Sequence, residues 1–457
     1  MNNGLQQAIS YKDPSGFVVK AAGEYYRLVA NRYATEYDHL IQSGLYDTLT
    51  TQRLMVSHTE VPLTEAHPDC YKRLYPQQLN FISYPFEWSY GQWRQVLLTY
   101  ININKIALEH GMILKDATSY NFTFCDNKCI LVDTLSFDFY NDEGPWLAYK
   151  QFCEEMLSPL LLMYYKDPNW AKLYSAAING LPLFFVSRHL PFYTRFNFFC
   201  LVHIHLHSKF QQVKRSGNTG GSGLNKDKLQ MLFKMLQKNV VKRKQPLLKN
   251  SIWDNYYQND IESDAYLADK ERIVTAWLSG ITPGVTIDLG ANTGKFSVIA
   301  AQISKQVYAV ENDTYCVDEL YQNIQASGHN NILPLVADIT DPSPGLGWNN
   351  DEKTPLLHRL KCDTVMALAL VHHLCLSKNI PLHFIAALLA DITSGHAIVE
   401  FVPKTDAKSK LLLELKGDIF DHYTEEEFVA SFKKYFKLSA SHMCEDSTRK
   451  LFLWQKI

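Results

Sequence analysis

The sequence predicts an α/β chain of two domains, an α+β domain followed by a doubly wound α/β domain. Two observations predict this division. In the second half, short apolar runs that end in acidic residues alternate with helical stretches, as in a sheet of mainly parallel strands. Between the halves, Lys214–Leu224 is rich in glycine and serine, which is typical of a linker. We therefore expect domains over residues 1–210 and 251–457, joined by a linker and connecting helix over 211–250.

The composition is that of a globular chain. Of 457 residues, 46% are hydrophobic and 13% are aromatic, which supports large buried cores. The formal net charge of -2 gives no general attraction to nucleic acid or to an anionic membrane. The nine cysteines lack paired spacing, so we expect neither a zinc site nor a disulfide framework, and the cytoplasm is the default location.

We expect neither a signal peptide nor a membrane span. The N-terminus has no basic stretch followed by an apolar one. The most apolar region, Leu181–Leu206, is interrupted by Arg188, Pro191 and Arg195, which favours a buried helix over a span.

The first half should contain both strands and helices. Gly16–Val19 is a possible short strand near the start. Apolar residues recur at helical spacing over Trp88–His110, and Gly111 stops that helix. The runs Asn121–Cys125 and Cys129–Val132 are β-like and flank a turn, so they predict a hairpin.

Helical, aromatic-rich sequence follows to about residue 210, and a charged helix is expected over residues 226–244. The first of these helical regions contains His203, His205 and His207, whose spacing suggests a metal site. Alternate residues of a helix do not share a face, so we expect no metal there. The basic run Lys238–Lys244 is interpreted as a solvated helix face.

Six strands can be placed in the second half. Each is a short apolar or alternating run, and several end in an acidic residue at the edge where ligands of open α/β sheets bind. In chain order they are Val285–Asp288, Gln306–Glu311, Leu333–Asp338, Asp363–Leu370, His396–Phe401 and Lys450–Gln455.

The turn after the first of these strands is the most informative motif. Asp288 ends the apolar run, Gly290 and Gly294 follow, and a helical pattern starts at about Gly294. Such a turn lets the backbone approach a ligand closely. A dinucleotide fingerprint would need glycine at positions 292 and 295, where this chain has Asn292 and Lys295. Asn tolerates the positive φ that the turn requires.

The pattern Asp288-x-Gly290-x-Asn292-x-Gly294 resembles motif I of the class I S-adenosylmethionine (SAM) methyltransferases, with Asn in place of the middle glycine. The resemblance implies a seven-stranded, Rossmann-like domain with SAM as cofactor. It places Asp288 near the methionine amino group. Glu311, at the end of the second strand, would accept hydrogen bonds from the ribose diol. Asp338, at the end of the third, would hold the adenine amino group, although Asp341 lies close by in the sequence.

His372 and His373 follow the fourth strand, where this family presents groups to the transferred methyl. A histidine titrates near neutral pH and can take a proton from an acceptor, so both are candidate catalytic residues. The alternative is a role in pocket shape or helix capping. No Asn-Pro-Pro-Tyr or Asp-Pro-Pro-Tyr sequence follows this strand, which argues against the nucleic-acid amino methyltransferases. Glu400 ends the fifth strand and is expected to border the acceptor pocket.

A second motif lies in the first half. Leu114-Lys-Asp-Ala-Thr-Ser-Tyr-Asn121, followed by Asp133, resembles the catalytic loop and metal-binding Asp of protein-kinase-like phosphotransferases. The resemblance implies Asp116 as base and Asn121 with Asp133 as metal ligands. The loop begins Leu-Lys instead of His-Arg, and Thr134-Leu135 replace the usual Phe-Gly. We therefore expect a degenerate kinase-like domain with a vestigial nucleotide or metal site, or only local hydrogen bonds by these side chains.

Together the two halves resemble bacterial SAM-dependent methyltransferases related to a nodulation protein, the NoeA-like group. The segments that carry this likeness are Ile82–Ser89, Leu114–Asn121 and Val132–Phe137. The resemblance implies a methyltransferase with an unidentified acceptor, a small molecule, glycan or lipid rather than nucleic acid. Two alternatives stay open. One is a kinase-like phosphotransferase with an accessory SAM domain, and the other is a non-catalytic SAM-binding scaffold. The sequence leaves the oligomeric state open.

Overall fold

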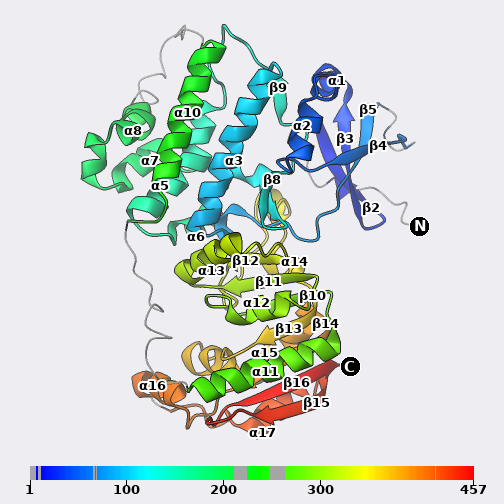
Figure 1. The fold of residues 1–457 in the computed structure, drawn as a ribbon, viewed down its shortest axis with the longest axis vertical. Coiled ribbons are helices and arrows are strands. Elements are labelled where there is room, and N and C mark those ends of the chain that lie inside the picture. The colour runs from blue at the N-terminus through cyan, green and yellow to red at the C-terminus, as the bar shows by residue number, and fades with distance from the viewer. Residues whose placement is uncertain are drawn as a thin grey trace. The chain divides into compact units, whose positions relative to one another are not determined.

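A computed structural model describes residues 7–8, 12–64, 67, 69–209, 224–247, 263–416 and 418–457. It divides the chain into two compact units (Figure 1). The first is Met1–Leu248 with Leu346–Glu352, and the second is Lys249–Gly345 with Lys353–Ile457. The linker expected at Lys214–Leu224 lies, apart from its last residue, outside the described residues.

The first unit starts with an antiparallel sheet of order β1-β2-β3-β5-β4. Val29 of β3 and Leu74 of β5 are fully buried and belong to the core on which this sheet packs. Two helices, α1 and α2, interrupt the sheet between β3 and β4. The bounds are Gln7–Ala8 (β1), Gly16–Ala21 (β2), Glu24–Ala30 (β3), Ala34–Gln42 (α1), Leu45–Thr51 (α2), His58–Val61 (β4) and Cys70–Pro76 (β5).

The helix expected at residues 88–110 is α3, Tyr90–Glu109. Ser89 caps its N-terminus by accepting a hydrogen bond from the backbone N–H of Gln92, and the Gln92 side-chain oxygen accepts one from the Ser89 N–H. The expected hairpin also forms, between β7 and β8, Phe122–Cys125 and Lys128–Leu131. A second short pair joins β6 and β9, Met112–Leu114 and Phe137–Phe139.

The rest of the first unit is helical. Helix α10, Lys226–Lys242, packs against α3, so the helix expected to connect the domains belongs to the first unit. The apolar region before it forms short helices and turns, and the described part of the chain contains no helix with the length and hydropathy needed to cross a bilayer. These elements are Tyr149–Gln151 (α4), Phe152–Leu157 (η4), Ser158–Tyr165 (α5), Trp170–Leu173 (α6), Leu183–His189 (α7), Phe192–Phe196 (η6), Phe198–Cys200 (α8) and Leu201–Leu206 (η7).

Two of the three histidines of this region, His203 and His207, lie beside Tyr149, and His205 does not. His203 Nδ1 lies 2.6 Å from the Tyr149 hydroxyl. His205 contacts other partners, with Nδ1 2.8 Å from Ser187 Oγ and Nε2 2.9 Å from Thr194 Oγ1. His207 stacks on the Tyr149 ring with the ring centroids 5.0 Å apart, so it shares a neighbour with His203 and not with His205.

The second unit is an α/β, Rossmann-like domain. Its seven-stranded sheet has the order β12-β11-β10-β13-β14-β16-β15. The first five strands in this order are parallel, and β16 is antiparallel to both of its neighbours. The bounds are Val285–Leu289 (β10), Gln306–Glu311 (β11), Ile332–Val336 (β12), Cys362–Ala367 (β13), Thr393–Phe401 (β14), Phe436–Met443 (β15) and Lys450–Lys456 (β16).

Chain order reverses between β12 and β13, so β10 and β13 become neighbours at the topological switch point. Because parallel crossovers are right-handed, the helices of the two halves cover opposite faces of the sheet. Helix α11 packs with α12 on one face, and α15 packs with α17 on the other (Figure 1). Their bounds are Asp264–Ile281 (α11), Lys295–Ala301 (α12), Leu382–Ile392 (α15) and Glu425–Phe432 (α17).

The six strands placed from sequence all form. The seventh strand, β15, was not located, although its alternating burial over Phe436–Met443 is what a half-exposed edge strand shows. It lies beside β16 at one end of the sheet.

Candidate functional site

The glycine turn after β10 has the conformation that its residues predict. Gly290, Asn292 and Gly294 have φ values of 72°, 50° and 86°. A Cβ at Gly294 would lie 2.2 Å from Leu320 Cδ1, so this glycine is needed for close packing as well as for its φ. The N–H groups of Gly290 and Ala291 donate to the Val310 carbonyl at 2.9 and 3.1 Å, which ties the turn to β11.

Asp288 lies at the start of this turn and is 2% exposed. One carboxylate oxygen accepts a 2.6 Å hydrogen bond from Ser297 Oγ on α12. Burial raises the pKa of Asp288 to about 6, against the opposing effects of the Ser297 hydrogen bond and the charge of Lys270. A cationic group bound beside it would therefore stabilise the ionised form.

Glu311 ends β11 and binds the same turn. Its Oε2 accepts from the Asn292 N–H at 3.0 Å, and its Oε1 accepts from the Asp313 N–H at 2.9 Å. Burial raises the pKa of Glu311, while hydrogen bonds from the backbone N–H groups of Asp313, Asn292 and Asn312 act in the opposite direction. The carboxylate is thus oriented rigidly at the sheet edge. Three backbone donors leave one of the roughly four lone-pair sites of the carboxylate for a bond from a ligand.

Asp338 follows β12, and its two carboxylate oxygens have different surroundings. Oδ1 accepts hydrogen bonds from the Thr340 N–H at 2.8 Å and the Thr340 hydroxyl at 2.6 Å. Oδ2 faces Lys378 Nζ at 3.9 Å. The neighbouring Asp341 is exposed, so the structure separates these two acids clearly.

A cavity of about 280 Å³ opens at the carboxyl ends of β10, β11 and β13, where open α/β sheets bind ligands. Most of the cofactor residues predicted from sequence line it, namely Asp288, Gly290, Asn292, Glu311 and Asp338. Gly294 is not in the lining and acts on the shape of the turn. The apolar part of the wall includes Phe296, Leu368 and Leu374.

The two candidate catalytic histidines are in different places. His373 lines the cavity, whereas His372 is 0% exposed and does not belong to the lining. Both ring nitrogens of His372 lack a hydrogen-bond partner among the described residues. Burial lowers the pKa of His373 to about 4 and that of His372 well below the usual value, so both rings are neutral at pH 7. Only His373 can touch a ligand in this cavity.

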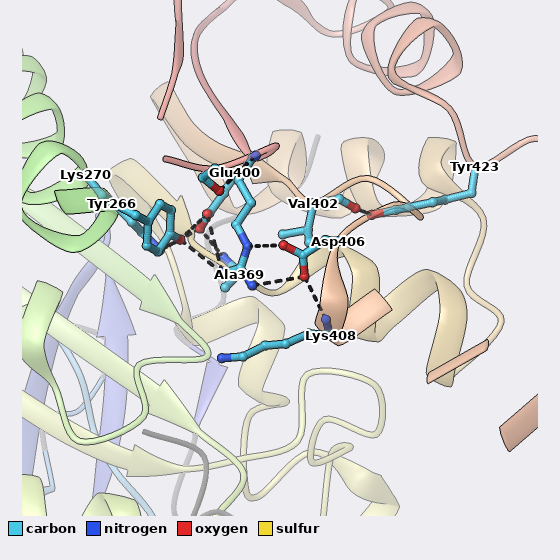
Figure 2. Close-up of polar contacts among 10 residues, drawn as sticks. Tyr266, Lys270, Ala369, Glu400, Val402, Asp406, Lys408 and Tyr423 are labelled. Carbon is cyan, nitrogen blue, oxygen red and sulfur yellow. Dashed lines mark hydrogen bonds and ion pairs between the residues drawn. The ribbon is translucent and has the colours of Figure 1, made fainter. Parts of the chain in front are cut away.

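A buried charge network borders the cavity (Figure 2). Lys270 of α11 donates to Glu400 Oε2 at 2.6 Å, and Tyr266 donates to the other oxygen of the same carboxylate. Glu400 Oε2 also accepts a 2.8 Å bond from the N–H of Ala369, a residue with a positive φ in the wall of the cavity. Glu400 is 0% exposed and does not line the cavity. It supports the cavity wall through its hydrogen bond from Ala369.

Arg449 at the start of β16 extends this network. Its guanidinium pairs with Asp406 at 2.9 Å and donates to the Tyr266 hydroxyl at 3.1 Å. Lys270, which itself lines the cavity, was not identified from sequence. The sequence around a lysine in an amphipathic helix does not indicate that the side chain is buried. The ion pair of Lys270 with Glu400 is seen only in the folded structure.

In the first unit, one of the three kinase-like residues, Asp133, is in an ion pair. Asp133 Oδ1 lies 2.6 Å from Arg27 Nη2 and accepts the N–H of Leu135 at 3.1 Å. The Asn121 amide donates to Ser136 Oγ at 3.0 Å. Burial raises the pKa of Asp116. Because Arg27 occupies the carboxylate that would bind a metal, these contacts fit the local hydrogen-bonding reading. The described residues contain no group of three or more His, Cys, Asp or Glu arranged to hold a metal ion.

The comparisons with known proteins point to one relative of similar length. The chain is 29% identical to the nodulation protein NoeA of Rhizobium meliloti over 98% of its own length and 95% of that protein. The chain is therefore similar to NoeA over nearly its whole length. The likeness runs through both units, and it does not bear out a kinase-like first unit. No family model matches the chain.

Solved structures also resemble part of the chain. Magnesium protoporphyrin IX methyltransferase from Synechocystis, with bound SAH, is 21% identical over 46% of this chain and 90% of its own, with a TM-score of 0.33. The N-methyltransferase NodS from Bradyrhizobium japonicum is 9% identical over 42% of this chain and 98% of its own, with a TM-score of 0.32.

Proposed function

We propose that this protein is a SAM-dependent methyltransferase whose second unit binds SAM in the cavity at the sheet edge. One observation carries the proposal. The motif-I pattern and the ends of two further strands single out five residues in the sequence. All five line a single cavity, namely Asp288, Gly290, Asn292, Glu311 and Asp338. These residues are far apart in the sequence, and they meet because the carboxyl ends of the parallel strands form one site.

The cavity offers a partner for each polar part of SAM. Asp288 would bind the ammonium of the methionine end, since a cation offsets the cost of ionising a buried carboxylate. Glu311 would accept from a ribose hydroxyl with its remaining lone pair. Asp338 Oδ2, the oxygen that Thr340 does not use, would accept from the adenine amino group.

When bound, SAM supplies a methyl group on a positively charged sulfur, which leaves with the electron pair of the S–C bond as the acceptor forms a new bond to the methyl carbon. The chain then has to orient the acceptor, exclude water and accept the acceptor's proton. His373 is the candidate for the proton, because it lines the cavity and its ring is neutral at pH 7. Its lowered pKa makes it a weaker base than a free histidine.

The acceptor is proposed to be a small molecule, glycan or lipid rather than nucleic acid. The chain has a formal net charge of -2, so it lacks the general basic character that binding to phosphate backbones needs. The loop after β13 also lacks the Pro-Pro-Tyr sequence of the nucleic-acid amino methyltransferases.

Isothermal titration with SAM tests the cofactor site. We expect binding by the parent and about tenfold weaker binding by Asp338→Asn, because the Asn amide would direct N–H toward a ligand donor. The matched control is Asp341→Asn, which changes an exposed acid three positions away and should leave the dissociation constant unchanged. A folded parent that does not bind SAM, or equal losses in both variants, would refute the proposed site.

Turnover separates an enzyme from a SAM-binding scaffold. We expect release of S-adenosylhomocysteine when labelled SAM is supplied with pools of small-molecule, glycan or lipid acceptors. His373→Gln should lower that rate by about 10²- to 10⁴-fold while SAM still binds. His383→Gln, on an exposed position of α15, is the control for a generic loss of histidine. Tight binding without methyl transfer to any pool would favour the scaffold.

A further inference from the structure

A short segment of the first unit exposes four aromatic rings. Between α7 and η7, Phe192, Tyr193, Phe196 and Phe198 are 69%, 56%, 80% and 73% exposed. We call the segment Phe192–Phe198 the aromatic knob. Monomeric soluble surfaces rarely gather large apolar side chains in this way without a binding role.

The aromatic knob is held in a defined conformation. The Thr194 side chain is 0% exposed, and its hydroxyl donates to the Pro191 carbonyl at 2.6 Å and contacts His205 Nε2 at 2.9 Å. Asn197 caps the following helix by accepting from the N–H of Cys200 at 3.2 Å. Thr194 and Asn197 thus make local hydrogen bonds, whereas the four aromatic rings and Arg195 are exposed. This inverts the usual pattern of a surface turn.

The charged side chains of the stretch that contains the aromatic knob are all basic. Arg195 lies over the Phe192 ring at 5.3 Å, and Arg188 is exposed on α7, four positions after the exposed Phe184. From α10, Arg243 reaches the ring of Phe199 at 5.0 Å. The chain has 47 acidic residues, yet none lies between Pro168 and Lys209. Neither Arg188 nor Arg195 makes an ion pair within the described part of the chain.

We propose that the aromatic knob docks the protein onto an anionic lipid bilayer surface. Aromatic side chains favour the boundary between headgroups and acyl chains, and nearby arginines are attracted to anionic headgroups. The knob is a single turn rather than a groove, so it fits insertion into a lipid surface better than capture of a peptide. Arg188 and Arg195, in a stretch of chain without acids, supply the charge complementarity. The overall charge of -2 gives no such attraction, so the interaction depends on this face alone.

Co-sedimentation of the full chain with vesicles tests the proposal. The vesicles are phosphatidylcholine, with or without phosphatidylglycerol. We expect binding to the anionic vesicles only, weakening as salt is added. The variant Phe192→Ser/Phe196→Ser/Phe198→Ser should lose binding by at least about tenfold, because the inserted apolar area is removed. Arg188→Ala and Arg195→Ala should each lower it by about fivefold.

The matched control is Trp348→Ser/Phe384→Ser/Ile419→Ser, which removes three exposed apolar side chains elsewhere and should bind as the parent does. Light scattering after gel filtration runs alongside. Equal binding to both kinds of vesicle, equal losses in the two triple variants, or no binding by a folded parent would overturn the proposal. A parent dimer that becomes monomeric in the knob variant, without vesicle binding, would assign the knob to self-association instead and equally overturn it.

Discussion

Glu311 has two roles if it binds SAM. Its carboxylate holds the backbone N–H groups of Asn292 and Asp313, and the proposed ligand would use its remaining lone pair. Replacing Glu311 by Ala would therefore disturb the glycine turn as well as remove a ligand contact. Asp338 is the cleaner position for a binding test, because its Oδ1 keeps the Thr340 bonds when Asn replaces it.

Asp288 makes SAM binding depend on pH. Its pKa is raised to about 6 by burial, and the proposed ammonium contact requires the ionised form. Above pH 7 the carboxylate is ionised and affinity is full. As pH falls through 6 it becomes protonated, and at pH 5 only about a tenth is ionised, so the dissociation constant should rise about tenfold. Titration calorimetry between pH 5 and 8 measures this.

Asp288→Asn is the control for this dependence. It should bind SAM more weakly at pH 7 and show little change between pH 5 and 8. A parent whose affinity is flat over that range would remove Asp288 from the ammonium site.

At the scale of elements, the turn between β10 and α12 depends on Gly294. Ala at this position would adopt a φ of 86° and place its Cβ 2.2 Å from Leu320 Cδ1. We expect Gly294→Ala to lower the free energy of unfolding by about 1–3 kcal/mol, since strain and overpacking add. Thermal or urea unfolding measures it. Gly280→Ala, in α11 with nothing within 4 Å of the added Cβ, should be neutral or stabilising by up to about 1 kcal/mol.

Helix α11 and strand β14 are joined by the Lys270–Glu400 pair, in which both side chains are 5% exposed or less. Lys270→Met should lower the free energy of unfolding by about 3 kcal/mol, because it leaves a buried carboxylate short of one partner. Lys361→Met breaks an exposed pair with Asp391 and should cost less than about 1 kcal/mol.

The double variant Lys270→Met/Glu400→Gln should recover part of that loss, since it removes the unpaired charge as well. The cycle is completed by urea unfolding of the parent, of Lys270→Met, of Glu400→Gln and of the double variant. Equal, small effects of Lys270→Met and Lys361→Met would show that the buried network does not stabilise this junction.

At the scale of the whole molecule, two compact units predict two unfolding transitions rather than one. SAM should raise the midpoint of one transition only, because it binds the second unit. At a free concentration of one hundred times the dissociation constant the gain is about 2.7 kcal/mol. Differential scanning calorimetry resolves this, and Asp338→Asn should reduce the shift. A shift of both transitions together would mean that the units unfold as one.

Local signals determined much of this protein in advance. Apolar runs of strand length placed six of the seven strands of the second unit, and the Asp-Gly-Asn-Gly spacing predicted a turn with positive φ at Asn292. These features are encoded locally, because period, chain reversal and φ preference depend on a few neighbouring residues. The edge strand β15 was missed because half of its residues face solvent and its apolar signal is weak.

Only the tertiary structure decided which side chains reach the cavity. Asp338 lines it and Asp341 does not, and His373 reaches it while His372 is buried behind. Lys270 contacts Glu400 across 130 positions of sequence, and Arg27 pairs with Asp133 in the first unit. Such choices depend on how separate elements pack, and a residue's neighbours in the chain carry no information about partners that arrive from another helix or strand.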